Sequence, residues 1–123
     1  MTPHVLLIED EPNIAEAIRF FLSRDGWRVS CHSDGATAMG EIARTTPDIV
    51  VLDVMLPNRS GFDVLRDLRA DPAWKSLPVL VLTAKGQARD RERAEHLGAT
   101  SFMAKPFSNA EVRDKLRDLV GHG

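Results

Sequence analysis

The segment that decides the fold class is residues 49–61, IVVLDVMLPNRSG. Four aliphatic residues stand directly before Asp53, and a continuous run of this kind is typical of a parallel strand covered on both faces by helices. A carboxylate at the end of a buried strand is costly unless a partner neutralises it. Two interpretations are open at this point. Asp53 is either an ordinary turn residue at a strand end or a reactive carboxylate at the rim of a sheet.

Further short apolar runs repeat this pattern along the chain. Residues 5–8 (VLLI) and 79–82 (VLVL) are aliphatic throughout, while residues 27–31 (WRVSC) and 101–104 (SFMA) resemble flanking strands. Apolar residues at helical spacing predict helices within residues 14–22, 38–42, 62–68, 87–98 and 108–119. Five successive strand–helix units predict an α/β fold: a flavodoxin-like, doubly wound (βα)5 arrangement with a five-stranded parallel sheet. We expect one domain over residues 1–123.

The predicted helix at residues 87–98 differs from the others in its apolar content. Its candidates for burial are Ala88 and Ala94, with Leu97 as the only large side chain, so we expect it to be among the less stable elements. The last helix, in contrast, opens with Ser108 and Glu111 at the spacing of a capping box.

Composition bounds the class of protein. Of 123 residues, 43% are hydrophobic and 28% are charged, as in an ordinary globular domain. The chain has 16 Lys and Arg against 18 Asp and Glu, a balance that offers no basic surface for direct binding of nucleic acid or of an anionic membrane. The single cysteine, Cys31, excludes an internal disulfide and is expected to be a buried packing residue. Because neither a signal peptide nor a membrane span is recognisable, we expect a cytoplasmic protein.

Polar residues of compatible chemistry follow four of the predicted strands. Glu9 and Asp10 follow the first strand, Asp53 the third, Thr83 the fourth and Lys105 the fifth. The carboxyl ends of parallel strands share one edge of the sheet, and ligands bind at that edge in open α/β folds. We therefore expect these side chains to meet, although they span most of the sequence.

The residue types at this edge suit phosphoryl transfer. Three crowded carboxylates repel one another unless a cation neutralises them, and oxygen ligands with open positions suit Mg²⁺. Lys105 adds a flexible positive charge, and Thr83 adds a small hydroxyl donor. Each residue alone has an ordinary alternative as a cap, a turn residue or a solvated side chain. Their conjunction favours Asp53 as a nucleophile in a reaction that depends on positioning and charge neutralisation.

Four segments closely resemble the receiver domain of two-component response regulators. They are VLLIEDE (5–11), VVLDVMLPNRSGFDVL (50–65), PVLVLTAKG (78–86) and LGATSFMAKPF (97–107), and the resemblance covers essentially the whole chain. It implies that Asp53 accepts a phosphoryl group from a histidine kinase or a phosphotransfer protein. It also implies that Mg²⁺ is held by Asp10, Asp53 and the main-chain carbonyl of Met55, while Glu9 acts largely through water.

The resemblance also assigns the residues that would transmit the signal. It implies that Thr83 and Lys105 contact the phosphoryl oxygens, that Phe102 is the switch aromatic, and that the Lys105–Pro106 peptide bond is cis. Phe102 has no hydroxyl, unlike the tyrosine that is common at this position, so we expect packing alone to hold its inward orientation.

Output is expected through protein–protein contact on the face built by residues 87–98, 101–104 and 108–119. Many relatives with DNA-binding output carry acidic residues where this chain has Thr100 and Ser101, so we do not expect the salt-bridged dimer that those relatives form on this face. Because only Gly121, His122 and Gly123 follow Val120, we expect a stand-alone, chemotaxis-regulator-like receiver without an effector domain. It should be mostly monomeric, with at most a weak dimer on activation, and it should catalyse only its own phosphorylation and dephosphorylation.

Several alternatives make different demands on the same residues. A flavodoxin-like nucleotide binder needs a phosphate-binding loop after the first strand, where residues 9–11 are acidic. Haloacid-dehalogenase-like phosphatases need a second aspartate two residues after the nucleophile, where Met55 stands. A phosphorelay intermediate that passes the phosphoryl group onward and a phosphorylation-independent adaptor both remain open as alternative functions.

Overall fold

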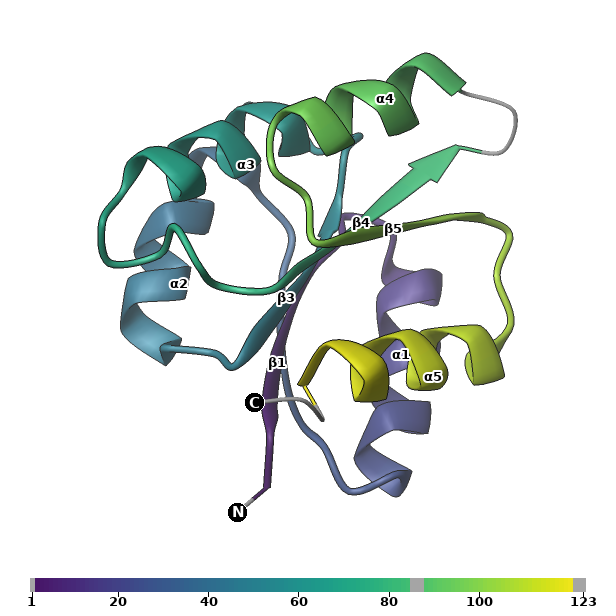
Figure 1. Cartoon of the computed structure of the whole chain (residues 1–123). Coiled ribbons are helices and arrows are strands. Elements are labelled where there is room, and N and C mark those ends of the chain that lie inside the picture. Colours follow the sequence, from purple (N-terminus) through teal and green to yellow (C-terminus); the bar gives the residue numbers. More distant parts are fainter. Residues whose placement is uncertain (1, 85–87, 121–123) are drawn as a thin grey trace.

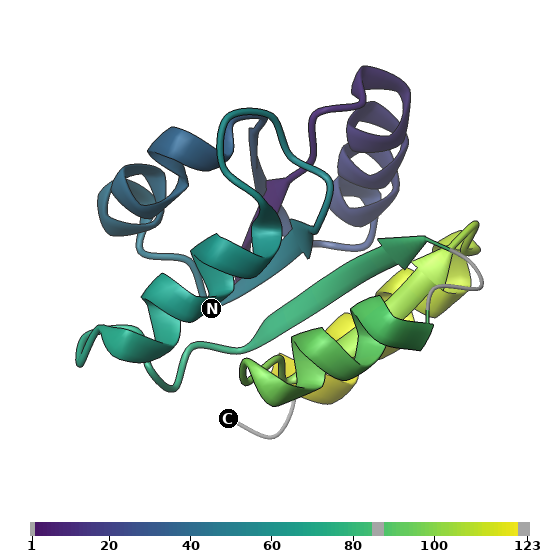
Figure 2. The ribbon, with the colours of Figure 1, turned by 90° about the horizontal axis from the view of Figure 1, so that it is seen from above.

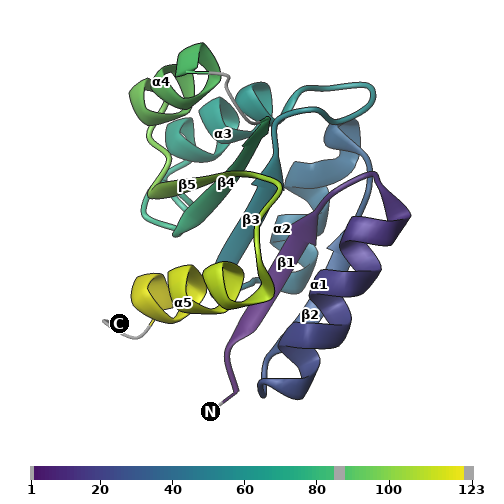
Figure 3. The same cartoon turned by 90° about the vertical axis from the view of Figure 1, so that its right-hand side faces the viewer.

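Five parallel strands form one sheet in the computed structural model of the chain, in the spatial order β2-β1-β3-β4-β5 (Figures 1 and 3). The structure describes residues 2–84 and 88–120. The strands are β1 (His4–Ile8), β2 (Arg28–His32), β3 (Ile49–Asp53), β4 (Val79–Ala84) and β5 (Ser101–Lys105). The helices are α1 (Pro12–Arg24), the 3-10 turn η1 (Gly35–Thr37), α2 (Ala38–Thr45), α3 (Gly61–Ala70), α4 (Ala88–His96) and α5 (Asn109–Val120). The predicted doubly wound α/β fold is confirmed.

Helices cover both faces of the sheet. Helices α1 and α5 lie on one face, and α2, α3 and α4 lie on the other (Figures 1 and 3). In β1, Val5 and Leu7 are buried beneath the first pair of helices, whereas Leu6 and Ile8 are buried beneath the other three. A central strand with two covered faces needs an apolar residue at every position, which explains the continuous aliphatic runs of the sequence.

The order of the strands reverses at β1. Strand β2 pairs with one edge of β1, and β3 pairs with the other. Ile8 is paired with Leu52, so the residues that follow them, Glu9 and Asp53, emerge side by side. Ligand sites of doubly wound sheets lie at such a reversal, outside the carboxyl ends of the strands.

Local signals at the last helix are confirmed. Ser108 Oγ accepts a hydrogen bond from the Glu111 N–H at 3.1 Å, and Glu111 Oε1 accepts one from the Ser108 N–H at 3.2 Å. These two bonds form the predicted capping box. Among the helices of the described ranges, none has the length and apolar character that a membrane span requires.

Two expectations about burial are wrong. Cys31 is exposed, because β2 is the edge strand of the sheet. Ala88 is also exposed, and Ala94 is the buried residue of α4. Helix α4 packs on the border of the sheet at β4 and β5, where only a narrow line of its surface is covered. Gln87, where this helix was expected to begin, lies outside the described residues.

Substitution of two glycines, one closely packed and one in open space, tests how tightly the backbone at the end of β3 is packed. A Cβ added at Gly61, the first residue of α3, would collide with the backbone oxygen of Asp53, whereas one added at the exposed Gly40 of α2 would meet nothing within 4 Å. We expect Gly61→Ala to lower the free energy of unfolding by about 1–3 kcal/mol, because backbone must shift. Gly40→Ala should raise it by ~0.5–1 kcal/mol through helix propensity. Urea denaturation followed by circular dichroism measures both, and a stabilising Gly61→Ala would contradict the close approach.

Candidate functional site

Three carboxylates meet at the carboxyl edge of the sheet, beyond the two central strands β1 and β3. Oxygens of Glu9, Asp10 and Asp53 lie within 4.8 Å of one another. Glu9 and Asp53 have exposed fractions of only 3% and 2%, whereas Asp10 faces solvent. Neighbouring buried carboxylates disfavour each other's charge, so their protonation and their partners decide what this site can do.

The Lys105 ammonium is the positive partner of both buried carboxylates. Its Nζ donates to Asp53 Oδ2 at 2.9 Å and lies 2.9 Å from Glu9 Oε1. That Glu9 oxygen accepts no hydrogen bond within the described part of the chain, so its contact with Lys105 is one of charge without hydrogen-bond geometry. The peptide bond between Lys105 and Pro106 is cis, as the resemblance implied.

Burial and mutual repulsion separate the protonation behaviour of the two carboxyl groups. Burial raises the pKa of Glu9 to about 7, and the neighbouring Asp53 adds to the rise. Burial alone would also raise the pKa of Asp53, but hydrogen bonds from Glu9, the Met55 N–H and Lys105 outweigh it and lower this pKa below its ordinary value. Burial would lower the pKa of Lys105, yet the two carboxylates raise it overall. Glu9 thus keeps a proton at pH values at which Asp53 is an anion and Lys105 a cation.

The donor atoms of this site fit a hard divalent cation. Glu9, Asp10 and Asp53 supply carboxylate oxygens. The buried Glu9 Oε1 accepts no hydrogen bond within the described residues, and a cation or a water bound to the cation would supply the missing contact. The Met55 N–H donates to Asp53 Oδ1 at 3.0 Å, which holds the main chain of Met55 beside this carboxylate. Magnesium binds through few carboxylates and keeps several waters, and the solvent-facing side at Asp10 leaves room for them.

Thr83 and Phe102 lie on the face of the sheet that α4 covers. Thr83 ends the buried part of β4 and is 4% exposed; Val81, two residues earlier, is paired with Phe102 of β5. Residues two apart along a strand share a face, so Thr83 and Phe102 lie on the same side of the sheet. The Arg91 guanidinium of α4 lies over the Phe102 ring, 4.3 Å from its centroid. Phe102 thus lies on the same face of the sheet as Thr83 and contacts α4 through Arg91.

The structure brings the expected strand-end residues to one edge, while the roles assigned to them stay predictions. Sequence reasoning missed a second set of residues around the site, Asp34, Gly35 and Asn58, which join two loops through contacts between side chains and backbone. Their residue types are turn signals, but turn signals predict only local structure.

A family model described as the response regulator receiver domain matches residues 5–117. The chain belongs to this family. Receiver domains are the phosphoaspartate-forming, Mg²⁺-binding modules of two-component signalling, and the recognition made from the four sequence segments is confirmed.

Individual relatives agree with this assignment. The chain is 44% identical over 116 residues to the probable transcriptional regulatory protein TcrX of Mycobacterium tuberculosis, an alignment that covers 94% of this chain and 49% of TcrX. A putative response regulator from Chloroflexus aurantiacus superimposes with a TM-score of 0.94 at 28% identity, covering 98% of this chain and 99% of that one. The receiver domain of the sensor histidine kinase PA1611 from Pseudomonas aeruginosa, solved with magnesium in its active site cleft, gives 0.89 at 31% identity, with 98% and 99% covered. The chain spans about half the length of the curated relatives it matches.

The raised pKa of Glu9 makes stability depend on pH. The folded protein keeps the Glu9 proton up to about pH 7, whereas the unfolded chain releases it near 4.5, so folding stability falls as pH rises between these values. We expect Glu9→Gln to abolish this fall. Without metal, the variant should exceed the wild type in free energy of unfolding at pH 8 by on the order of 2 kcal/mol, and the two should be nearly equal at pH 4.5. Chemical denaturation at both pH values measures the difference, and a variant that is less stable at pH 8 would contradict the burial cost of Glu9.

Proposed function

We propose that this receiver is a phosphorylation-switched signalling domain whose phosphoryl acceptor is Asp53. The observation that carries the proposal is the Asp53 carboxyl group, 2% exposed, at the end of the central strand β3, with Lys105 Nζ 2.9 Å from its Oδ2. The donor would be the phosphohistidine of a histidine kinase or of a phosphotransfer protein. The lowered pKa of Asp53 supports this role, because the attacking oxygen must be deprotonated.

The proposed transfer uses few residues of the chain. An Asp53 oxygen attacks the phosphorus, the phosphorus–nitrogen bond to the donor imidazole breaks, and its electron pair stays on the ring nitrogen. Lys105 lies where it can neutralise a phosphoryl oxygen, and the Thr83 hydroxyl can donate to another. Bound Mg²⁺ would neutralise further charge on these oxygens. Asp10, Asp53 and the Met55 carbonyl would hold it, with Glu9 acting through water. We propose no substrate for this chemistry beyond Asp53 itself.

Output is proposed to leave through the face formed by α4, β5 and α5. When the Thr83 hydroxyl turns toward a phosphoryl group on Asp53, it leaves a space on this face of the sheet. The Phe102 ring can then rotate into that space. Rotation of Phe102 would remove the ring on which Arg91 rests and so change the position of α4. A partner protein would recognise the altered face.

Whether the domain acts alone stays a prediction. The curated relatives TcrX and KdpE are described as transcriptional regulatory proteins, and this chain covers 49% and 50% of their lengths. Their function in transcription belongs to those longer chains.

The acceptor assignment is tested by intact-mass measurement after incubation with acetyl phosphate and Mg²⁺. We expect one added phosphoryl group in the wild type and none in Asp53→Asn. Asp114→Asn, at an exposed aspartate of α5, is the matched control and should be modified like the wild type. An Asp53→Asn protein that gains the same mass would refute the assignment. A wild type that gains none, yet binds its partner equally with and without beryllofluoride, would favour the adaptor function.

The expectation of a monomer gains support from the charged groups of the output face. Arg91 is stacked on Phe102, and Glu111 accepts a capping hydrogen bond from the Ser108 N–H at 3.2 Å. Arg91 of one molecule and Glu111 of another could form an ion pair across a dimer on this face, but the pair would compete with these contacts. An exposed ion pair contributes only ~0.2–1 kcal/mol, which is too little to hold a dimer by itself.

We therefore expect the beryllofluoride-activated protein to sediment mainly as a monomer at micromolar concentration. Glu111→Lys should not change its sedimentation, and neither should the control Glu16→Lys on α1. A tight activated dimer that Glu111→Lys dissociates and Glu16→Lys leaves intact would show that this face serves self-association.

A further inference from the structure

We propose that residues 32–37, which run from the last residue of β2 to the start of α2, are a positioning element that fixes the distance between the two loops of the candidate metal site. This inference rests on the proposed function of the site. One loop follows β1 and carries Glu9 and Asp10; the other, residues 54–60, follows β3 and carries Met55. Residues 32–37 contact both loops, and they lie beside the second one (Figure 2).

The first group of contacts holds the tip of the loop at residues 54–60. The Gly35 N–H donates to the carbonyl oxygen of Pro57 at 3.2 Å, and Asn58 Nδ2 donates to Asp34 Oδ2 at 2.9 Å. Gly35 is buried against this loop so closely that an added Cβ would collide with the backbone oxygen of Arg59. Asn58 has a φ of +69°, a conformation that asparagine tolerates better than most residues. The tip is therefore held by a side chain and by the main chain.

The base of the same loop is fixed separately. The Gly61 N–H donates to the carbonyl oxygen of Val54 at 3.0 Å, and the Val54 N–H donates to the Leu82 carbonyl oxygen at 3.3 Å. Met55 lies between this base and the tip at Pro57, and its side chain is 71% exposed. Packing of the Met55 side chain thus contributes little to its position. The Met55 N–H is held by Asp53 Oδ1 at 3.0 Å, and the contacts at the two ends of the loop supply the other constraints on the place of the Met55 carbonyl.

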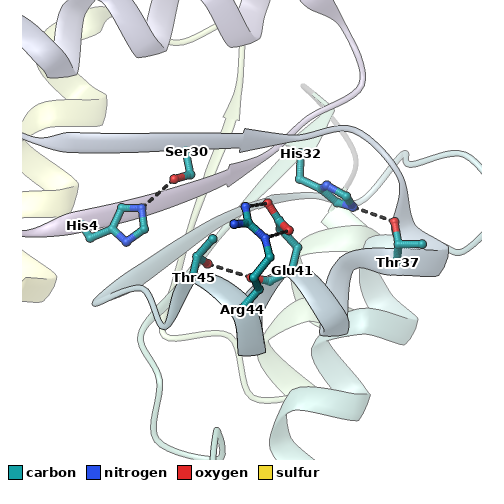
Figure 4. A network of polar contacts seen from close by, with 7 residues as sticks. All are labelled: His4, Ser30, His32, Thr37, Glu41, Arg44 and Thr45. Atoms are coloured by element: carbon teal, nitrogen blue, oxygen red, sulfur yellow. Dashed lines mark hydrogen bonds and ion pairs between the residues drawn. The ribbon is translucent and has the colours of Figure 1, made fainter.

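A second group of contacts ties residues 32–37 to the acidic loop after β1. The Glu9 N–H donates to the His32 carbonyl oxygen at 2.9 Å. The His32 ring is in turn held by Thr37, with Nε2 and Oγ1 2.7 Å apart (Figure 4). Asp34 Oδ1 accepts a hydrogen bond from the Ala36 N–H at 2.8 Å, which stiffens the turn between these points. One short segment thus contacts both the residue Glu9 and the loop that carries Met55, in addition to the pairing of β1 with β3.

This arrangement matters for Mg²⁺ because the ion demands near-ideal octahedral geometry at short distances. Residues that orient the ligands without touching the ion commonly change metal affinity by tenfold or more. We infer that Asp34, Gly35 and Asn58 act on Mg²⁺ affinity and on the rate of Asp53 phosphorylation through the position of Met55.

The test uses a charge clash and its repair. Asn58→Asp places a carboxylate against Asp34 and should open the contact between the two segments. In the double variant Asp34→Asn with Asn58→Asp, the amide and the carboxylate exchange places, so the hydrogen bond can reform while the net charge returns to that of the wild type. We expect Asn58→Asp to weaken Mg²⁺ binding about tenfold, measured by calorimetric titration, and the double variant to return to within about twofold of the wild type. On charge alone, the extra carboxylate of Asn58→Asp would strengthen binding of a cation, so the two effects have opposite signs.

A second pair of variants removes one carboxylate each instead of adding one, and it does not depend on whether the first variants fold. Asp34→Ala removes the acceptor for both Asn58 and Ala36, and Asp71→Ala removes a similar turn hydrogen bond, from the Ala73 N–H at 2.9 Å, at the end of α3. We expect Asp34→Ala to weaken Mg²⁺ binding and to speed amide hydrogen exchange at Met55 and Gly35, and Asp71→Ala to do neither.

Unchanged exchange at Met55 and Gly35 in Asp34→Ala, or a double variant that binds Mg²⁺ as weakly as Asn58→Asp, would overturn the positioning role. A wild type that binds no Mg²⁺ would instead overturn the proposed function of the site, while the exchange rates would still decide whether residues 32–37 hold the loop.

Discussion

The site depends on the Lys105 ammonium, which lies 2.9 Å from carboxylate oxygens of both Glu9 and Asp53. Because β1 and β3 are adjacent, the chain cannot separate the two carboxylates that follow them. Burial of either charge is unfavourable without a partner, and one ammonium cannot fully neutralise two anions. The raised pKa of Glu9 shows the result, since this group keeps its proton while Asp53 loses its own. The site is therefore arranged so that an additional cation can take the place of a proton.

Much of this arrangement could be predicted from sequence, because residues that follow neighbouring parallel strands lie at the same edge of the sheet. Strands β1, β3 and β4 each contain four successive aliphatic residues, which only burial on two faces explains, and their carboxyl ends share an edge whatever the details of the helices. The failures are equally physical. Cys31 lies on an edge strand and Ala88 on a helix at the border of the sheet, and apolar character alone does not show which side chains such elements leave uncovered.

The contacts around residues 32–37 could not be predicted for a different reason. Asp34 and Asn58 are 24 residues apart, and each is read from the sequence as the residue of its own turn. Their pairing depends on how far β2 and β3 extend and on the close approach that Gly35 permits, which are properties of the assembled sheet. The ends of strands thus show which groups meet, whereas the connections between strands and helices determine the distances at which they meet.

The weak anchoring of α4 sets what a phosphoryl group on Asp53 can accomplish. Helix α3 buries Phe62, Val64, Leu65 and Leu68, whereas α4 buries Ala94. Cation–π contacts of Arg91 and Arg93, each 4.3 Å from a ring centroid, contribute only ~0.5–1 kcal/mol apiece at exposed sites. Reversing a two-state population from 1:99 to 99:1 takes ~5.5 kcal/mol, and a hydrogen bond to a charged group contributes ~1.5–3 kcal/mol. Two or three new contacts at the phosphoryl group are therefore enough to move an element held as loosely as α4. They would not be enough to dislodge a helix anchored like α3, so under the proposed function the scarcity of apolar residues in α4 would be what allows a single modification to change the output face.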